Sequence, residues 1–417
     1  MQQRSAHLGL MVILLTSFIS GCVVAPVKPL TASEPRYAQD EDEQKIIRQA
    51  VELEEELRRK AQLLQDEAVL KYVRDVALRL IPAAAAKTVA FRIEVLRDPV
   101  VNAFALPNGG IYLSVGLLAR LQNEAQLAHV LSHEIAHVVQ RHGLQQHRSR
   151  KATIIAAHIA DLALFGTSLA YLPAIGALAS YSREGEMEAD QLALGYMAQA
   201  GYPLEGAEQL FQLLQEVKEK ESVWGSVYSS HPDNQQRVQI AKDIIDSHRL
   251  STNAGASLAA SEYLGIRDRL IVENLQLKLN VRQYQLAADY AAQALLQNPA
   301  SAWLHYYYAE GHRLMAEDPI GAAREHAWIN DKKSNQELIE TYRKKTPALR
   351  ATARQSYQQA LTTDKHFAIA YRGLGLLAYA EGDRKAAREA LNFYLKHAGD
   401  IRDRRYIDNI IGRVSTP

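Results

Sequence analysis

The feature that most constrains the fold is an apolar segment that carries two histidines and a glutamate. Residues 130–139 read Val-Leu-Ser-His-Glu-Ile-Ala-His-Val-Val, with the acid directly after the first histidine. The apolar residues predict a buried helix, in which positions four apart lie on one face. The imidazoles of His133 and His137 can then reach the same cation. Burying them beside Glu134 is costly unless a metal or mutual hydrogen bonds compensate; an exposed helix with solvent-facing histidines is the alternative.

The composition excludes several classes of protein. The chain has 417 residues, of which 47% are hydrophobic and 23% charged, so it has the composition of an ordinary globular protein. Its length predicts two or three domains. With 48 basic and 47 acidic residues the net charge is +1, and we expect no nucleic-acid partner. Cys22 is the only cysteine in the sequence, which excludes intramolecular disulfides and thiolate metal clusters.

The hydrophobic pattern of residues 40–250 predicts a mainly helical (α+β) domain with a small β-sheet. Apolar positions three and four apart predict helices over residues 40–80, 126–142 and 183–200. Alternation of apolar residues predicts a strand over 91–96, and a turn at Asn108-Gly109-Gly110 leads into a second strand over 111–114. We expect this second strand to offer an edge to which an extended peptide adds by backbone hydrogen bonds.

An apolar stretch at residues 154–179 is interrupted by His158, Asp161 and Pro173. Its apolar run never reaches the roughly 18 residues expected of a membrane span. This pattern favours a lid over the site rather than a transmembrane helix.

The C-terminal part, residues 255–417, consists of expected helix pairs rich in Ala, Leu and Tyr. Small and apolar residues over 368–395 are spaced as in the tetratricopeptide consensus of about 34 residues. A looser copy covers 277–299, and a third begins at 303–323. We predict a TPR-like α-helical repeat domain, with a plain helical bundle as the alternative. Three consecutive tyrosines are candidates for a client-binding surface, or else belong to the core between the repeat helices: Tyr306, Tyr307 and Tyr308.

The first 21 residues are predicted to be a lipoprotein signal peptide. Their apolar run, residues 8–19, is too short to span about 30 Å of hydrocarbon, and small residues follow it before Cys22. This arrangement resembles the bacterial lipobox, which implies lipidation of Cys22; an ordinary secretory signal cut near Ala25 is the alternative. Residues 22–39 are proline-rich and read as a tether. Val23 after the cysteine favours the outer membrane, with the protein facing the periplasm.

A second acidic segment follows the histidines at residues 182–190, which read Ser-Arg-Glu-Gly-Glu-Met-Glu-Ala-Asp. Zinc in a catalytic site needs a third protein ligand and a fourth position for water. Glu186 and Asp190 share one helix face through their four-residue spacing, and Glu184 and Glu188 share another. For Glu184 and Glu188 a solvated helix face is the alternative.

Together these segments resemble the gluzincin metallopeptidases of the CAAX prenyl endopeptidase and HtpX family. Further matches are Asn102-Ala103-Phe104-Ala105, Gly109-Gly110-Ile111, and Ser230-His231-Pro232 with Arg237 beyond it. With the repeat-like tail, the chain is most similar to the BepA-like periplasmic proteases. The resemblance implies a helical zincin-type metallopeptidase domain.

The resemblance also implies a role for each matching residue. His133, His137 and Glu186 are the implied ligands of one Zn²⁺ per chain, and Glu134 is the general base. Asp190 is implied to orient a ligand imidazole. Glu188 is the competing third ligand, but it lacks the helix face that Glu186 shares with Asp190.

Two further residues lie downstream of the acidic segment. His231 matches a position that can cap the metal as a fourth ligand and hold the enzyme latent; a plain turn histidine beside Pro232 is the alternative. Arg237 is implied to stabilise the developing oxyanion, or else pairs with a carboxylate.

We therefore expect a zinc metalloendopeptidase of the bacterial cell envelope that hydrolyses misfolded or misassembled envelope and outer-membrane proteins through a metal-activated water. Its partners are expected to be unfolded polypeptides and, through the TPR-like module, the outer-membrane assembly machinery. Membrane contact is expected only through the N-terminal lipid, with a soluble periplasmic form as the alternative. The competing hypothesis is a periplasmic chaperone or assembly scaffold whose zinc site is latent or locked by His231.

Overall fold

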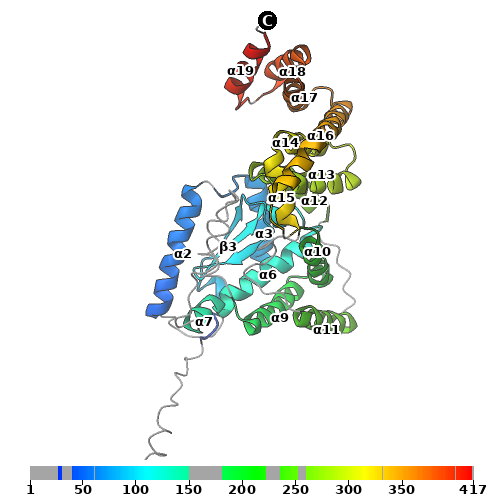
Figure 1. Cartoon of the computed structure of the whole chain (residues 1–417). Coiled ribbons are helices and arrows are strands. Elements are labelled where there is room, and N and C mark those ends of the chain that lie inside the picture. The colour runs from blue at the N-terminus through cyan, green and yellow to red at the C-terminus, as the bar shows by residue number, and fades with distance from the viewer. Residues whose placement is uncertain are drawn as a thin grey trace, which may run out of the picture.

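A computed structural model describes residues 27–30, 40–60, 62–149, 181–221, 235–251, 260–330, 332–399 and 401–415. These residues form a mainly helical protein with one small sheet, as the sequence predicts (Figure 1). The N-terminal elements are α2 (Glu41–Arg59), α3 (Glu67–Leu80), α4 (Ala83–Ala86), β1 (Arg92–Leu96), β2 (Ala103–Ala105), β3 (Gly110–Ser114), α5 (Val115–Leu118), α6 (Glu124–Gln140), α7 (His142–Ser149), α9 (Arg183–Gln199), α10 (Glu205–Glu221) and α11 (Gln235–Ser251). Predictions for Cys22, for the lid at 154–179 and for His231 lie outside the described residues, as does the side chain of Arg237.

The sheet has the strand order β1-β3-β2, with β3 parallel to β1 and antiparallel to β2. The prediction that residues 111–114 offer a free edge is therefore wrong, because β3 is hydrogen-bonded on both sides. The far side of β1 is also contacted, since the Leu64 N–H donates to the Val95 carbonyl at 2.8 Å. The short strand β2 is the edge that lies beside α6. All three residues of β2 are buried, so its sequence lacks the alternation that marks a half-exposed strand.

The turn between β2 and β3 depends on a glycine. Gly109 has φ +87°, a left-handed conformation that residues with a side chain rarely adopt. A Cβ added there would lie 2.4 Å from Val89 Cγ1. The predicted Asn-Gly-Gly turn is confirmed, and it brings β3 back antiparallel to β2.

The helix predicted over residues 40–80 is divided into α2 and α3. Asp66 ends the interruption, because its carboxylate accepts hydrogen bonds from the N–H groups of Ala68 and Val69 and caps α3. Before that cap, Leu63 forms an isolated antiparallel bridge with Leu96 at the end of β1. Between α2 and α3 the backbone therefore pairs with the sheet instead of continuing as a helix.

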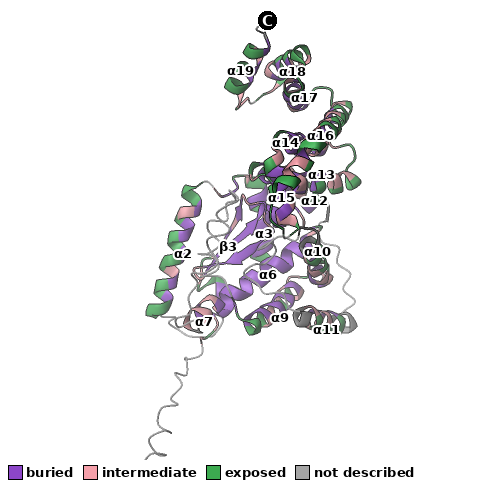
Figure 2. Cartoon of the chain, viewed as in Figure 1, coloured by how far each residue is buried: buried purple, intermediate pink, exposed green. Residues whose placement is uncertain are grey.

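Helix α6 lies at the centre of the N-terminal part and is buried along its whole length (Figure 2). It begins at the cap Asn123, whose side chain accepts a hydrogen bond from the Gln126 N–H. It ends at Arg141, which has φ +59°. Helices α3, α9 and α10 and strand β2 all pack against it, so any polar group that α6 carries is enclosed by protein.

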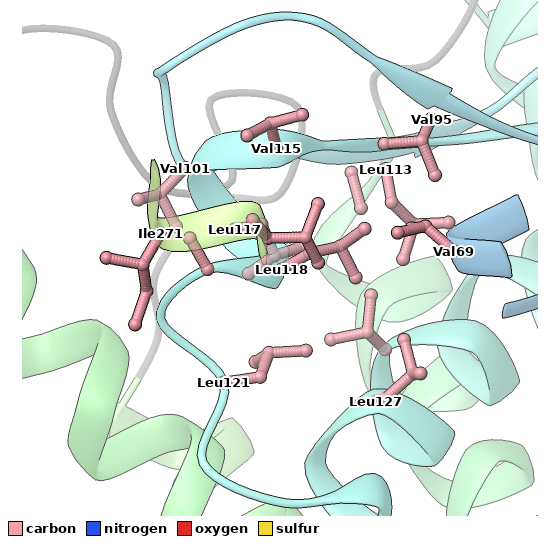
Figure 3. Close-up of a cluster of buried hydrophobic side chains, with 14 of the residues drawn as sticks. Val69, Val95, Val101, Leu113, Val115, Leu117, Leu118, Leu121, Leu127 and Ile271 are labelled. Carbon is pink, nitrogen blue, oxygen red and sulfur yellow. The ribbon is translucent and has the colours of Figure 1, made fainter. Parts of the chain in front are cut away.

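The main hydrophobic core joins the sheet, α3, α5 and α6 (Figure 3). Leu113 of β3 and Leu117 of α5 are fully buried in it. Ile271, from the C-terminal helices, enters the same cluster. The core therefore continues from the sheet-bearing part into the C-terminal part.

The C-terminal part contains only helices among its described residues. These are α12 (Ala260–Asn280), α13 (Tyr284–Gln297), α14 (Ala302–Glu317), α15 (Pro319–Ile329), α16 (Gln336–Thr363), α17 (Ala368–Glu381), α18 (Arg384–His397) and α19 (Arg404–Ser415). Neighbouring helices pack as pairs, notably α13 with α14 and α17 with α18. The helical prediction is confirmed, whereas the TPR assignment stays a prediction. The hydroxyls of Tyr263 and Tyr290 fasten this part to the N-terminal part by donating to the carbonyls of Leu118 and Ala119, at 2.8 and 2.6 Å.

The proposed client surface at three consecutive tyrosines is not supported by their burial. Tyr306 and Tyr307 are only 6% and 4% exposed, because they pack against Trp303, Tyr357 and Phe367. They belong to the core between helices, and Tyr308 is half-buried.

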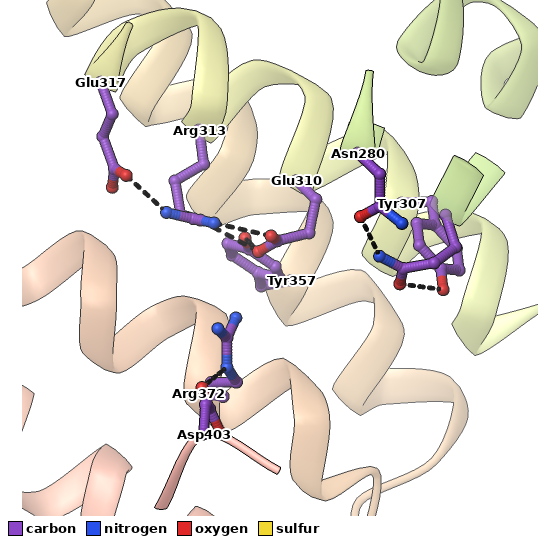
Figure 4. A network of polar contacts seen from close by, with 9 residues as sticks. Asn280, Tyr307, Glu310, Arg313, Glu317, Tyr357, Arg372 and Asp403 are labelled. Carbon is purple, nitrogen blue, oxygen red and sulfur yellow. Dashed lines mark hydrogen bonds and ion pairs between the residues drawn. The ribbon is translucent and has the colours of Figure 1, made fainter. Parts of the chain in front are cut away.

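A buried polar network links α14 to α16 (Figure 4). The Arg313 guanidinium donates two hydrogen bonds to the Glu310 carboxylate, at 3.0 and 2.7 Å, and the Tyr357 hydroxyl donates a third. Burial raises the pKa of Glu310, but the charge and hydrogen bonds of Arg313 outweigh it, so the pKa lies below its usual value. This carboxylate is neutralised by its own neighbours.

Within the described ranges, no helix is both long and apolar enough to cross a bilayer.

Candidate metal centre

Helices α6 and α9 bring two imidazoles and one carboxylate to a single point. His133 Nε2 lies 3.0 Å from His137 Nε2, and the two nitrogens lie 3.5 and 3.6 Å from oxygens of Glu186. The three side chains are at most 2% exposed. One ligand atom from each lies within 4.8 Å of the others, so the group could hold one metal ion.

The local sequence explains why these side chains converge. His133 and His137 share a face of α6 through their four-residue spacing. The facing helix α9 begins at Ser182, whose hydroxyl accepts a hydrogen bond from the Gly185 N–H. This cap fixes the first turn of α9, and Glu186 follows it directly. Packing of α6 against α9 then places the carboxylate opposite the imidazoles.

The donor set suits a divalent metal. Two imidazole nitrogens and one carboxylate oxygen are the three protein ligands found in catalytic zinc sites of this kind. Burying Glu186 at 0% exposure beside two imidazoles is costly without a compensating charge. The arrangement therefore fits an ion bound between the three side chains.

Asp190 lies one turn after Glu186 and contacts the other nitrogen of a ligand. Its Oδ1 lies 2.9 Å from His133 Nδ1, the nitrogen that faces away from His137. Burial lowers the pKa of His133, but the hydrogen bonds and charges of Asp190 and Glu186 outweigh it and raise the pKa. The contact fixes the ring so that Nε2 faces the metal position.

Glu134 is fully buried, at 0% exposure, and follows the first ligand directly on α6. Glu188, the competing ligand in the sequence, does not join the metal group. Its side chain is 49% exposed, and Oε2 lies 3.3 Å from His142 Nε2. Glu186 is thus the carboxylate that the structure places beside the imidazoles.

Two further residues, His142 and Tyr181, belong to this group although no motif in the sequence marks them. His142 is 2% exposed, and its Nδ1 lies 2.8 Å from Nδ1 of His137. Burial lowers the pKa of His142, and Glu188 offsets part of that effect. No spacing rule relates these residues to the site: His142 follows a left-handed residue, and Tyr181 precedes α9.

The ring of Tyr181 stacks on the ring of His137, with centroids 3.6 Å apart and an interplanar angle of 11°. Its hydroxyl donates to the Ala105 carbonyl of β2 at 3.0 Å. Burial and the charges of Glu134 and Glu186 hold the pKa of Tyr181 well above its usual value, so the hydroxyl keeps its proton. Tyr181 therefore bridges the metal group and the edge strand.

A comparison with known proteins finds a family match over the region that holds the metal group. Residues 67–245 match the model of peptidase family M48. The region contains every residue of the metal group.

Three relatives carry names that agree with the family match. The chain is 28% identical over 266 residues to the beta-barrel assembly-enhancing protease of Escherichia coli, covering 58% of this chain and 54% of the relative. It is 30% identical over 201 residues to a putative beta-barrel assembly-enhancing protease of Vibrio cholerae (45% and 41%). It is 32% identical over 170 residues to the mitochondrial metalloendopeptidase OMA1 of Schizosaccharomyces pombe (40% and 50%). The chain spans about half the length of these relatives.

Proposed function

We propose that the chain, whose residues 67–245 match peptidase family M48, is a zinc-dependent endopeptidase that cleaves unfolded or misassembled proteins of the bacterial cell envelope. The observation that carries the proposal is the buried group of His133, His137 and Glu186, with Glu134 beside it. A helix bundle that served only as a scaffold would have no need to enclose these four polar side chains together.

The chemistry divides between the ion and the chain. A bound zinc ion would supply a Lewis acid that polarises the scissile carbonyl and makes water more acidic. Glu134 is the residue that would take the proton from the attacking water and pass it to the leaving amine. Asp190 holds the ring of His133 in place throughout. The enclosure of the site strengthens each of these interactions, because little water remains to screen them.

The outer edge of β2 is the place where a substrate backbone would bind. The Ser114 N–H donates to the Asn102 carbonyl and the Leu106 N–H donates to the Gly110 carbonyl, so residues 102 and 106 face β3. In an antiparallel pair the intervening residues 103 and 105 face the other way. Their backbone groups therefore point away from β3, toward the side on which we propose that an extended peptide adds as a further strand. Recognition through backbone groups favours chains that are unfolded.

The side chain of Asn102 offers an additional acceptor at the start of β2. Its Oδ1 is buried and accepts no hydrogen bond within the described residues. A substrate N–H that reached this oxygen would satisfy it, and a buried acceptor without a partner is costly. This observation supports binding of a peptide backbone at β2.

The proposal also covers the location of the protein and its partners. We place the chain with the BepA-like members of the CAAX prenyl endopeptidase and HtpX family, anchored through Cys22 in the outer membrane and facing the periplasm. The names of two relatives, which refer to β-barrel assembly, support an envelope role. The TPR-like helices would then contact clients or assembly machinery. His231 remains a proposed fourth ligand that keeps the enzyme latent, and Arg237 a proposed oxyanion contact.

The test is cleavage of unfolded casein by the purified mature protein. Chelator should abolish cleavage and added zinc should restore it. Glu134→Gln should reduce cleavage to background while the protein still binds one zinc per chain. The matched control is Glu184→Gln, an exposed glutamate on α9 that should cleave like the wild type. Equal cleavage by the wild type and the Glu134 variant would remove the enzyme assignment and favour the scaffold hypothesis.

A further inference from the structure

The two imidazoles of the metal group are held in different ways. His133 is oriented directly by a carboxylate, since its Nδ1 lies 2.9 Å from Asp190. His137 has a second histidine in that place: its Nδ1 lies 2.8 Å from His142 Nδ1. Beyond that ring, His142 Nε2 lies 3.3 Å from a carboxylate oxygen of Glu188. The second imidazole is therefore connected to a carboxylate through an intervening histidine.

The tautomers along this series follow from the geometry. His137 faces the metal group with Nε2, so that nitrogen must keep a lone pair and the proton of the neutral ring lies on Nδ1. This N–H then donates to Nδ1 of His142, which must be the acceptor. The proton of His142 consequently lies on Nε2, from which it donates to Glu188. One assignment satisfies every nitrogen in the series.

The backbone places His142 where this series needs it. A residue five positions after His137 would not face it along a regular helix, because neighbours on a helix face lie three or four apart. Arg141 interrupts the helix with φ +59°, and its guanidinium is held by hydrogen bonds to Glu43, one of them at 3.1 Å. The reversal returns the imidazole of His142 to the ring of His137.

We propose that His142, supported by Glu188, is the positioning residue for the metal ligand His137. It fixes the tautomer and ring angle that leave Nε2 directed at the metal, as Asp190 does for His133. The inference rests on the proposed zinc site and extends it by a pair of residues that lie outside the ligand set.

The test measures zinc affinity by competition with a chelator, in the full chain and without any substrate. His142→Ala removes the acceptor, and zinc should bind about 10- to 100-fold more weakly, the usual cost of losing such a partner. His142→Asn keeps an oxygen near the position of Nδ1 and should recover most of the affinity. Glu188→Gln should give a smaller loss than His142→Ala. Glu184→Gln, an exposed glutamate one turn earlier on α9, should leave the affinity unchanged.

The outcomes separate this inference from the proposed function. If the wild type binds zinc and His142→Ala binds it equally tightly, the positioning role is overturned while the zinc site stands. If the wild type binds no zinc, both fail. The folding of His142→Ala is judged by circular dichroism of the zinc-free protein. If it does not fold, His142→Asn and Glu188→Gln decide the question. Unchanged zinc affinity in Glu188→Gln together with a loss in His142→Asn would contradict the proposal.

A second inference rests on a different observation, the hydrogen bond between Tyr181 and the edge strand. The Ala105 carbonyl points away from β3, toward the side where a substrate strand would lie. Its acceptor is occupied by the Tyr181 hydroxyl at 3.0 Å, while the tyrosine ring covers His137. A peptide N–H cannot donate to the same lone pair in the same direction.

We infer that Tyr181 occupies the substrate position at β2 and must move before an extended peptide can pair there. The side chain is thus an autoinhibitory contact between the edge strand and the proposed metal site. This inference also rests on the proposed function, so its test separates binding from hydrolysis.

The test compares peptide binding in chains that cannot hydrolyse the peptide. In a Glu134→Gln background, Tyr181→Phe removes the hydroxyl and keeps the ring, and an unstructured casein-derived peptide should bind about 2- to 10-fold more tightly, the range expected for one hydrogen bond that no longer competes. Tyr181→Ala should bind the peptide at least as well. The matched control is Tyr263→Phe, which removes a buried hydroxyl bonded to a backbone carbonyl away from the site.

Unchanged or weaker peptide binding in the Phe variant would overturn the autoinhibitory role. Zinc affinity of the same variant should match that of the Glu134→Gln parent, because the hydroxyl is bonded to the Ala105 carbonyl and the ring that covers His137 is retained. A loss of zinc would contradict the inference by showing that Tyr181 supports the metal group instead.

Discussion

Two buried glutamates in this protein both lie on helices, but different side chains surround their carboxylates. Glu310 of α14 is bonded to the guanidinium of Arg313 and to the hydroxyl of Tyr357 (Figure 4). Glu186 of α9 faces the imidazoles of two histidines, which are weak bases and metal ligands. The first group carries its own positive charge. The second presents an arrangement of ligand atoms that a divalent ion would complete, and this difference distinguishes a structural network from a functional centre.

The largest expected effect comes from deleting Glu186. Glu186→Ala removes a ligand, so zinc affinity should fall by more than the roughly 100-fold that marks loss of an orienting partner, and casein cleavage should be lost. Glu310→Ala should leave zinc affinity unchanged. Chelator competition measures both. A similar loss of zinc in the two variants would remove the distinction between the centres.

Breaking the Glu310 network in the C-terminal part should lower the stability of the protein and leave its zinc affinity unchanged. Arg313→Met leaves the 5%-exposed Glu310 without its main cation, which should lower the free energy of unfolding by about 3–5 kcal/mol. Zinc affinity of the folded protein should not change. Denaturant titration of the zinc-free protein measures the stability, and an effect below about 1 kcal/mol would show that the network contributes little.

An intermediate effect is expected at Asp190. Asp190→Asn keeps an oxygen near His133 Nδ1 but removes the charge, so zinc affinity should fall about 10- to 100-fold while the fold is retained. The control is Asp403, which accepts a hydrogen bond from Arg372 at 2.6 Å in the C-terminal part. Asp403→Asn should bind zinc like the wild type; a shared loss would point to a general effect of lost charge.

The smallest effect concerns pH. Because the pKa of Glu310 is lowered below its usual 4.5 in the folded protein, its stabilising contribution is present above about pH 4.5 and is lost as the pH falls through the folded-state value. The stability difference between the zinc-free wild type and Glu310→Gln should therefore be constant from pH 7 to about 5 and shrink below that. A difference that grows in acid would contradict the sign.

Spacing was enough to predict part of the site and the elements that hold it. A four-residue interval placed His133 and His137 on one face, and the same interval favoured Glu186 over Glu188, as the structure has it. The strand at 91–96 and the turn at Gly109 also follow from local pattern.

The remaining features depend on tertiary packing that a single sequence does not display. Strand β2 is three residues long and buried on both faces, so no alternation marks it, and β3 was wrongly expected to be the edge. His142 reaches His137 only because Arg141 adopts a left-handed conformation, which is rare for residues with a side chain. Tyr306 and Tyr307 are buried between helices, and the repeat pattern in the sequence does not determine how those helices pack.

The central claim is that His133, His137 and Glu186 together hold one divalent ion. The most direct test is an anomalous difference map at the zinc edge from crystals of the zinc-loaded protein. We expect one strong peak per chain, within bonding distance of Nε2 of both histidines and of a Glu186 oxygen. A peak elsewhere, or none between these three side chains in a protein that cleaves casein, would contradict it.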